Sequence, residues 1–370
     1  MSRPPRVYVS AGEPSGDAHA APLVSALRRL VPGVEIDALG GPRMDAAGAR
    51  LLDRMEDFSV VGFVEALTQI PAHYRLLGRT RAALRAGRYD LVILVDYPGY
   101  HLRAAAAARE AGVPVLYYIA PQMWAWGAWR ARRLAAVRRL AVILPFEEKF
   151  FSARGIATTF VGHPLKDRPA PPAKAEARRA LGLDPSRPVL GLFPGSRNQE
   201  VLRMWPAFRA AADRVRAARP DMQVVVAGTP TGAYPDPGPV RIATGDPGLV
   251  FAAADAGICK SGTTTLEAAI AGLPMVITYR THPVSHFIGM RLLSVPWVGL
   301  VNLVAEREVC PELLQSRMRA DLLADRVLPL LDPASAEARA QRAGLAEVRD
   351  RLGPPGAADR VAGLAAAMLR

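Results

Sequence analysis

Residues 258–280 read ICKSGTTTLEAAIAGLPMVITYR, and this stretch decides the fold. It predicts the end of a strand, a tight turn at Ser261-Gly262, a helix, a Gly-Leu-Pro stop and a second apolar strand. Three successive threonines are poor helix formers, but their hydroxyls and the unpaired N–H groups of a first helical turn suit an anion. The pattern therefore indicates a phosphate-binding site, although an ordinary threonine-capped helix has the same sequence features. Glu267 lies one turn further in, where a carboxylate repels phosphate but can hold a pair of sugar or ribose hydroxyls.

The length, net charge and composition of the chain limit the classes of protein to which it can belong. A chain of 370 residues is too long for one core and suits two domains of ordinary size. Its net charge of +13 favours an anionic partner, which can be nucleic acid, an acidic membrane or a phosphorylated substrate. Only four of the 47 basic residues are lysines, so part of the arginine excess can reflect genome composition.

Two cysteines, Cys259 and Cys310, give neither a disulfide framework nor a metal-ligand cluster, and they fit a reducing compartment. The apolar run at residues 7–9 is too short for a signal peptide, and no segment approaches 18 uninterrupted apolar residues. We therefore expect a cytosolic protein whose membrane contact, if any, is peripheral.

The first half alternates apolar strand-like runs with helical patterns, which is typical of a parallel sheet covered on both faces. Glycine-containing turns follow the first two strands at Gly12–Asp17 and Gly40–Pro42, and they either let backbone approach a ligand or are purely structural. The expected strands are 6–11, 34–39, 90–96, 113–119, 141–144 and 158–161.

The clearest buried strand, residues 90–96, ends in the carboxylate Asp96. Ligands of open parallel sheets bind beyond the carboxyl ends of the strands, so Asp96 is placed to face a substrate. A desolvated carboxylate there can act as a general base. The alternative is that Asp96 caps the helix expected at 102–111. His163, in a later turn, is either an interdomain structural residue or a ligand contact.

Two segments combine apolar or aromatic residues with arginines. Residues 59–87 fit either an amphipathic segment on an anionic bilayer or a core helix with a solvated basic face. Residues 124–129 contain three tryptophans, and an arginine-rich helix is expected at 130–140. That second pattern suits nucleic acid, a membrane or an acidic substrate, but it is more often packing beside a solvated face.

A proline-rich stretch at 167–173 predicts a linker, after which strand-turn-helix units begin again as a second doubly wound domain. In it, Pro194-Gly195-Ser196-Arg197 follows a strand and places an arginine at the same crevice edge as Ser261–Thr265. An arginine fork with helix-start amides holds a diphosphate without a metal. A last helix at 357–369 is expected to pack back across the first domain.

These motifs together resemble the lipid-A-disaccharide synthase family, inverting glycosyltransferases of the two-domain GT-B type, over nearly the whole chain. Each motif is weak alone, and their number, order and spacing carry the resemblance. The matching residues are 11–17, 40–44, 96–99, Pro121 with 124–126, 144–147, 162–165, 194–197, 261–267, Pro274 to Val276 with Tyr279 and Arg280, and Asn302-Leu303.

The resemblance implies an α/β GT-B fold, with two Rossmann-like domains facing a cleft. Residues 1–167 with helix 356–370 would form the acceptor and membrane-facing domain, and 168–355 the UDP-sugar donor domain. The reaction implied is transfer of 2,3-diacylglucosamine from its UDP conjugate to 2,3-diacylglucosamine 1-phosphate, giving a β-1,6 disaccharide and UDP without cofactor or metal. Asp96 would be the catalytic base. The implied donor residues are Arg197, Ser261, Gly262, Thr263, Thr265, Glu267 and Asn302, and the implied acceptor or cleft residues are Glu13, Ser15, Asp17, Met44, Trp124 and His163.

The resemblance also implies peripheral contact with the anionic cytoplasmic face of the inner membrane and no nucleic-acid partner, and it leaves the oligomeric state open. His101 stands where asparagine is common in the family, which makes it a candidate acid-base group. Two rival functions remain at this stage. One is a non-hydrolysing UDP-sugar epimerase of the same architecture, and the other is a non-enzymatic protein that binds anionic ligands through its positive charge.

Overall fold

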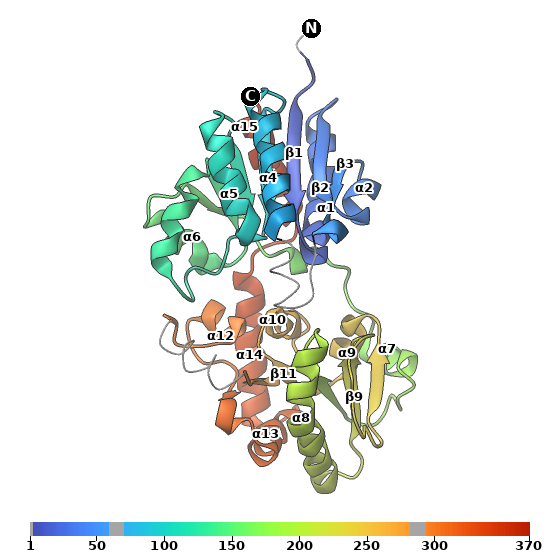
Figure 1. Cartoon of the computed structure of the whole chain (residues 1–370). Coiled ribbons are helices and arrows are strands. Elements are labelled where there is room, and N and C mark those ends of the chain that lie inside the picture. The colour runs from blue at the N-terminus through green and yellow to red at the C-terminus, as the bar shows by residue number, and fades with distance from the viewer. Residues whose placement is uncertain (1–2, 59–69, 282–293) are drawn as a thin grey trace. The chain divides into compact units, whose positions relative to one another are not determined.

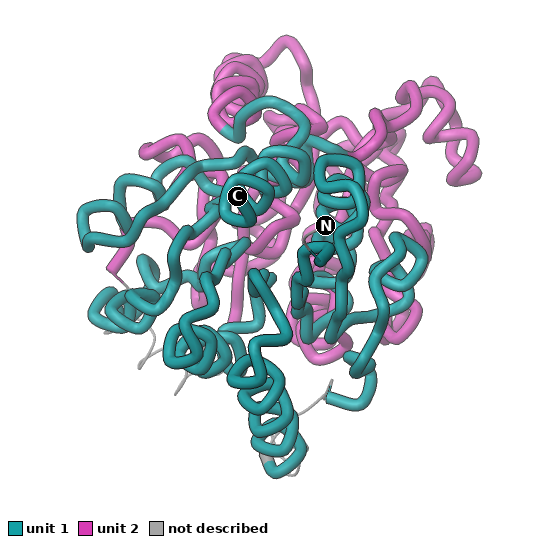
Figure 2. Tube along the Cα trace, turned by 90° about the horizontal axis from the view of Figure 1, so that it is seen from above, with its two compact units in different colours: residues 1–167, 352–370 teal, residues 168–351 magenta. Residues whose placement is uncertain are grey.

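The computed structural model describes residues 3–58, 70–281 and 294–370 (Figure 1). The chain forms two compact units, coloured separately in Figure 2. Unit 1 consists of residues 1–167 and 352–370, and unit 2 of residues 168–351. The chain returns to unit 1 at Leu352 rather than at residue 356, because the Leu352 carbonyl accepts the backbone N–H of His163 (2.9 Å).

Unit 1 is built on a parallel sheet in the order β3-β2-β1-β4-β5-β6-β7. The strand order reverses between β1 and β4, whose carboxyl ends lie side by side with Ala11 opposite Val95. The strands are β1 (Arg6–Ala11), β2 (Glu35–Gly40), β3 (Arg50–Arg54), β4 (Leu91–Val95), β5 (Val115–Tyr118), β6 (Arg139–Val142) and β7 (Thr158–Phe160).

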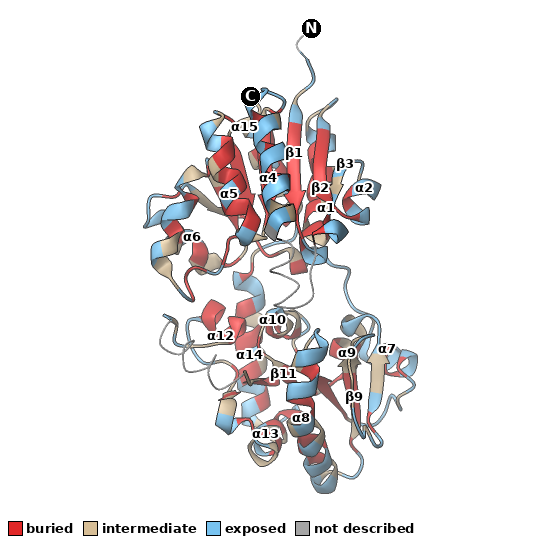
Figure 3. Ribbon diagram, in the orientation of Figure 1, coloured by how far each residue is buried: buried red, intermediate tan, exposed pale blue. Residues whose placement is uncertain are grey.

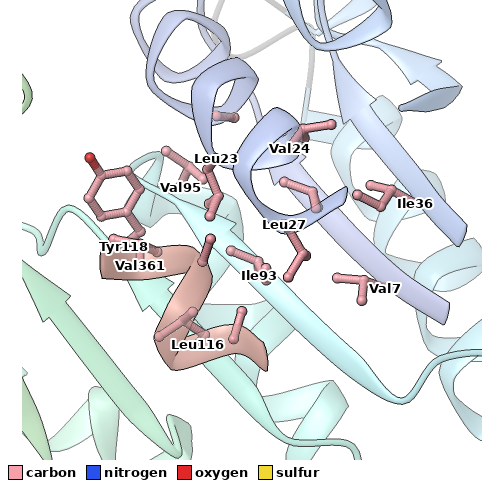
Figure 4. Close-up of a cluster of buried hydrophobic side chains, with 14 of the residues drawn as sticks. Val7, Leu23, Val24, Leu27, Ile36, Ile93, Val95, Leu116, Tyr118 and Val361 are labelled. Carbon is pink, nitrogen blue, oxygen red and sulfur yellow. The ribbon is translucent and has the colours of Figure 1, made fainter. Parts of the chain in front are cut away.

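All residues of β4 and β5, and all but the first residue of β1, are buried, as the continuous apolar runs predict. Figure 3 shows β1 mostly in the colour of buried residues. Figure 4 shows one buried cluster in which Leu23, Val24 and Leu27 of α1 lie. Ile93 of β4, Leu116 of β5 and Val361 of the late helix α15 belong to the same cluster. The helices of unit 1 are α1 (Pro14–Leu30), α2 (Pro42–Ala46), α4 (Ile70–Arg85), α5 (Pro98–Glu110), α6 (Pro145–Ser152) and α15 (Ala357–Met368), with 3₁₀ turns η1 (Met55–Asp57), η2 (Ala128–Ala136) and η3 (Pro164–Asp167).

The helix predicted at 130–140 is confirmed only in part, since the segment is a shorter 3₁₀ helix. A 3₁₀ turn, η2, ends at Ala136, and β6 begins at Arg139. Leu140 to Val142 are fully buried in the sheet, so pairing with β5 and β7 determines their conformation rather than the helix propensity of the preceding arginines.

Unit 2 repeats the architecture, with a parallel sheet in the order β10-β9-β8-β11-β12-β13. Its strand order reverses between β8 and β11, where Phe193 lies opposite Cys259. The strands are β8 (Val189–Phe193), β9 (Gln223–Gly228), β10 (Arg241–Thr244), β11 (Ala256–Lys260), β12 (Met275–Tyr279) and β13 (Glu312–Leu314). The helices are α7 (Lys174–Ala180), α8 (Asn198–Ala218), α9 (Pro247–Ala253), α10 (Thr263–Ile270), α12 (Leu300–Ala305), α13 (Ala320–Val327) and α14 (Ala336–Arg351), with 3₁₀ turns η4 (Gln315–Arg317) and η5 (Pro329–Leu331).

The predicted α/β class with two parallel sheets is confirmed. Among the described residues, the helices are too short or too polar to cross a bilayer. Within that same part of the chain, His, Cys, Asp and Glu side chains form no cluster suited to a metal ion. The amphipathic segment predicted at 59–87 is described only from Ile70 onward, and residues 59–69 lie outside the described residues.

Candidate functional site

Each sheet has one topological switch point, and parallel α/β sheets bind ligands at the carboxyl ends of the strands there. In unit 1 the turns after β1 and β4 meet at this position, and we call Gly12–Ser15 with Asp96–Gly99 the unit-1 site. In unit 2 the turns after β8 and β11 meet, and we call Pro194–Arg197 with Lys260–Thr265 the unit-2 site.

Asp96 occupies a strained turn. Its φ is +52° and that of Tyr97 is +51°, a left-handed conformation that costs residues with a Cβ about 1–2 kcal/mol each. Two buried side chains hold the turn by donating to the Asp96 carbonyl, the Tyr117 hydroxyl at 2.6 Å and His101 Nδ1 at 2.5 Å. Because a carbonyl only accepts, the His101 proton is on Nδ1, and Nε2 accepts the Ser10 hydroxyl (2.8 Å).

His101 is fully buried, and desolvation lowers its pKa to about 4, although its bond to the Asp96 carbonyl opposes the shift. The ring is therefore neutral at pH 7, and both nitrogens already have partners. This arrangement suits a positioning residue for the Asp96 turn and does not suit the acid-base role considered from the sequence.

The Asp96 carboxylate is partly exposed, and its pKa is raised above the ordinary value. Burial is the main cause, the backbone N–H of Tyr97 opposes it, and the negative charge of Glu13 adds to it. A raised pKa makes the carboxylate a stronger proton acceptor. The effect of the Glu13 charge on the Asp96 pKa shows that the two carboxylates lie close enough at this sheet edge to interact electrostatically.

The Tyr97 ring packs directly against the turn that carries Glu13. A Cβ added to Gly12 would lie 2.3 Å from Cδ1 of Tyr97, so only glycine permits this approach. The Tyr97 hydroxyl is hydrogen-bonded to His73 Nε2 (2.6 Å), which ties the turn to α4. The two turns of the unit-1 site are thus locked by aromatic packing.

The other predicted acceptor-side residues divide into exposed and buried groups. Glu13 and Ser15 are exposed at the unit-1 site. Asp17 is buried and accepts the N–H groups of Gly41, Arg43 and Met44, while the Met44 side chain is itself fully buried. Asp17 and Met44 therefore support the turn after β2 from within the fold.

Trp124 and His163 also serve packing. Trp124 donates its indole N–H to buried Glu147 (2.9 Å), whose pKa burial raises to about 7 although this bond opposes the shift. The His163 side chain is buried, and its Nδ1 accepts the N–H of Leu165.

The unit-2 site is made by glycines and helix starts. Gly195 has φ +124° and Gly262 φ +143°, which side-chain-bearing residues rarely adopt. The helices that follow, α8 and α10, begin beside each other without a side-chain cap. Their first-turn N–H groups, with the positive ends of two helix dipoles, make an anion-binding edge.

Arg197 and Thr263 are exposed at this edge, with 75% of the Arg197 side chain accessible. The hydroxyls of two other residues predicted to bind the donor form hydrogen bonds within the protein. The Ser261 hydroxyl donates to the Val298 carbonyl (2.8 Å), and the Thr265 hydroxyl donates to the Gly262 carbonyl (2.9 Å). An anion here would meet backbone amides and the Arg197 guanidinium rather than a row of hydroxyls.

Asn302 and Glu267 have internal partners as well. Buried Asn302 donates to Cys310 and Glu312 and accepts the N–H groups of Val309 and Cys310. Since Ser261 bonds the neighbouring 298–299 turn that Glu312 caps, Asn302 braces the unit-2 site from behind. Glu267 pairs with the exposed Arg168 (2.5 Å), which must move before the carboxylate can hold a sugar hydroxyl.

Sequence reasoning missed Glu200, whose carboxylate forms ion pairs with Lys260 and with Arg197 (3.6 Å) in the unit-2 site. Lys260 Nζ lies 2.8 Å from Glu200 Oε1, and a Cβ on Gly195 would lie 2.8 Å from the other carboxylate oxygen. That oxygen, Oε2, is buried, and no group of the described residues forms a hydrogen bond with it. The position of Lys260 directly before Ser261-Gly262, and of Glu200 three residues after Arg197, was the available signal.

The chain is similar in sequence to proteins of one known family over nearly its whole length. The family model described as lipid-A-disaccharide synthetase matches residues 7–355. A lipid-A-disaccharide synthase of Geobacter sulfurreducens is 41% identical over 98% of this chain and 97% of its own. The enzyme of the same name from Anaeromyxobacter sp. (strain K) is 43% identical over 96% of each chain.

Solved structures show the fold. The calicheamicin glycosyltransferase CalG4 superposes with a TM-score of 0.61 at 19% identity, covering 100% of this chain and 99% of its own. A UDP-GlcNAc 2-epimerase from Neisseria meningitidis, solved with UDP-GlcNAc bound, gives a TM-score of 0.60 at 10% identity, covering 97% and 98%. The GT-B fold expected from the sequence is confirmed.

Proposed function

The chain belongs to the lipid-A-disaccharide synthase family and is a glycosyltransferase, and from this premise we propose that it transfers 2,3-diacylglucosamine from its UDP conjugate to the 6-hydroxyl of 2,3-diacylglucosamine 1-phosphate. The products are the β-1,6 disaccharide 1-phosphate and UDP. The structural observation that supports the proposal is Asp96, a carboxylate of raised pKa held at the unit-1 site.

In this proposal Asp96 is the catalytic base. It takes the proton of the acceptor hydroxyl while the oxygen attacks the anomeric carbon and the bond from that carbon to the diphosphate breaks, which inverts the configuration. Its left-handed turn, fixed by His101 and Tyr117, holds the carboxylate in place before the substrate binds. General-base catalysis of this kind contributes about 10²–10⁴-fold to the rate.

The unit-2 site binds the UDP part of the donor in the same proposal. Departure of UDP places negative charge on the diphosphate, and the amides at the start of α8 and α10 together with Arg197 stabilise that charge. Each charge-assisted hydrogen bond contributes about 1.5–3 kcal/mol. Glu267 would hold a ribose or sugar hydroxyl after Arg168 moves away, and Asn302 would act through Ser261 rather than on the donor itself.

We also infer that the enzyme works at the cytoplasmic face of the inner membrane as a peripheral protein. Both proposed substrates carry acyl chains and negative charge, and exposed Tyr74, Trp126 and Trp129 lie among arginines in unit 1. Aromatic and basic side chains together favour an anionic bilayer surface.

A UDP-release assay with the acylated donor tests the function. We expect UDP release only when 2,3-diacylglucosamine 1-phosphate is also present, with the disaccharide as the second product. Conversion of UDP-sugar without an acceptor would instead identify a UDP-sugar epimerase, and salt-sensitive DNA binding without UDP affinity would identify an anion-binding protein.

A further inference from the structure

Unit 1 contains a long groove beside the unit-1 site. It has a volume of about 870 Å³ and is lined by residues of α4, α5 and η2, and α5 packs against both α4 and η2. Along α5 its lining runs from Pro98 to Arg109, about 17 Å at 1.5 Å per residue. The groove therefore starts two residues beyond Asp96 and continues away from it.

Six arginines line this groove, which we call the arginine groove. Arg103 donates to the Gly99 carbonyl (2.5 Å), and Arg132 lies over the Trp129 ring. Within the described part of the chain, none of the six forms an ion pair with a carboxylate. Unpaired guanidinium groups gathered in one hollow repel each other, so an anionic ligand would stabilise them. They are Arg81, Arg103, Arg109, Arg130, Arg132 and Arg133.

The same groove has apolar walls, formed by Leu77, Leu102 and the alanines of α5 and η2. It adjoins a second pocket of about 300 Å³, with which it shares Tyr74, Leu77, Gly99 and Arg103. Tyr97 and Tyr100 complete that second pocket, and Tyr97 directly follows Asp96. This aromatic pocket is lined by both Tyr97 and Arg103, so it joins the residue next to Asp96 to the arginine groove.

We propose that the arginine groove is the subsite for the phosphate of the acylated acceptor, and that the aromatic pocket holds part of its acyl chain. This inference rests on the proposed function, because it assigns the substrate whose hydroxyl reaches Asp96. Two observations carry it: the aromatic pocket is lined by Tyr97, the neighbour of Asp96, and it opens at Arg103 into a groove whose guanidinium groups can bind phosphate through bidentate hydrogen bonds.

The test compares two acceptors in neutral-detergent micelles, 2,3-diacylglucosamine 1-phosphate and the same molecule without its phosphate. The variant is Arg130→Ala/Arg133→Ala on η2, where both residues line the groove and form no ion pair with any residue that the structure describes. We expect the wild-type preference in kcat/KM for the phosphorylated acceptor to fall by about 10- to 100-fold in the variant. The KM for the donor and the kcat/KM for the acceptor without phosphate should stay near the wild-type values.

The matched control is Arg203→Ala/Arg214→Ala on α8, which removes the same charge from exposed positions in unit 2. A preference unchanged by Arg130→Ala/Arg133→Ala, or an equal loss with both acceptors, would overturn the subsite. So would a variant that keeps the preference but no longer sediments with phosphatidylglycerol vesicles, since the groove would then bind membrane headgroups. Absence of UDP release by the wild-type enzyme with either acceptor would defeat the proposed function itself, and the subsite with it.

Discussion

The unit-1 and unit-2 sites both lie where the strand order of a parallel sheet reverses, but they are formed by different kinds of residue. At the unit-1 site the backbone positions with positive φ belong to Asp96 and Tyr97, and burial, together with the charge of Glu13, raises the pKa of Asp96. At the unit-2 site they belong to Gly195 and Gly262, beside Arg197 and Lys260. At the switch point of the sheet, unit 1 thus offers a side chain to a ligand, whereas unit 2 offers the backbone.

The difference teaches what each ligand requires. A base must have a side chain, so unit 1 keeps Cβ-bearing residues in left-handed backbone and holds them with the buried Ser10, His101 and Tyr117. A diphosphate is bound by amides, so unit 2 uses glycines that let the backbone come close. Four substitutions test this contrast.

The largest effect is expected from Asp96→Asn. Asparagine keeps the size of the side chain but cannot accept the acceptor proton, so kcat should fall by about 10²–10⁴-fold while UDP affinity stays near normal. Steady-state kinetics and calorimetric UDP titration measure the two quantities. Turnover equal to wild type would remove Asp96 as the base and with it the contrast between the sites.

Arg197→Ala should have the complementary effect. Loss of one charge-assisted contact to the diphosphate should weaken UDP binding by about 10- to 100-fold, because such a contact contributes about 1.5–3 kcal/mol. Isothermal titration calorimetry checks this, with exposed Arg203→Ala as the control of equal charge. Equal UDP affinity of Arg197→Ala and wild type would show that the amides alone form the anion site.

His101→Ala tests the support behind the unit-1 turn. The shorter side chain cannot bridge Ser10 and the Asp96 carbonyl, so kcat should fall about threefold to tenfold as the carboxylate loses its position. The acid limb of the pH profile should stay in place because His101 does not titrate near neutrality. A limb that moves with this substitution would make His101 a proton-transfer group instead.

The smallest effect is expected from Glu13→Gln. The pKa of Asp96 is raised, so protonation inactivates the base at a higher pH than for an ordinary aspartate, and kcat/KM falls as pH decreases through that value. Removing the Glu13 charge lowers the Asp96 pKa and should move the acid limb to lower pH. Glu13→Asp keeps the charge and serves as the control, and an unmoved limb in Glu13→Gln would leave burial as the whole cause.

Much of this contrast could be predicted because it depends on local sequence. The strand Arg6–Ala11 has its predicted bounds, and the carboxyl ends at Asp96 and Arg197 follow continuous apolar runs. The strand Arg50–Arg54 was missed, since its sequence RLLDR shows no alternation of apolar and charged residues and it lies at a sheet edge, where none of its residues is fully buried. The three-residue strand Glu312–Leu314 is too short to leave a pattern.

Side-chain partners were less predictable, because they depend on residues far apart in sequence. Ser261 and Thr265 looked like ligands within 258–280, but the partner of Ser261 is the Val298 carbonyl. The Lys260–Glu200 pair joins residues 60 positions apart. His101 needs Ser10 on another strand before its role as a positioning residue is visible.

The return of the chain to unit 1 has a consequence for biosynthesis. Val361, Ala362 and Ala365 of α15 belong to the same buried cluster as Val7, so the first sheet made by the ribosome cannot be covered until residues near 365 have emerged. Unit 2, which is continuous from 168 to 351, can complete its own core earlier. The unit translated second is thus able to fold first, and during that interval the apolar surface of β1 and α1 is a target for chaperones.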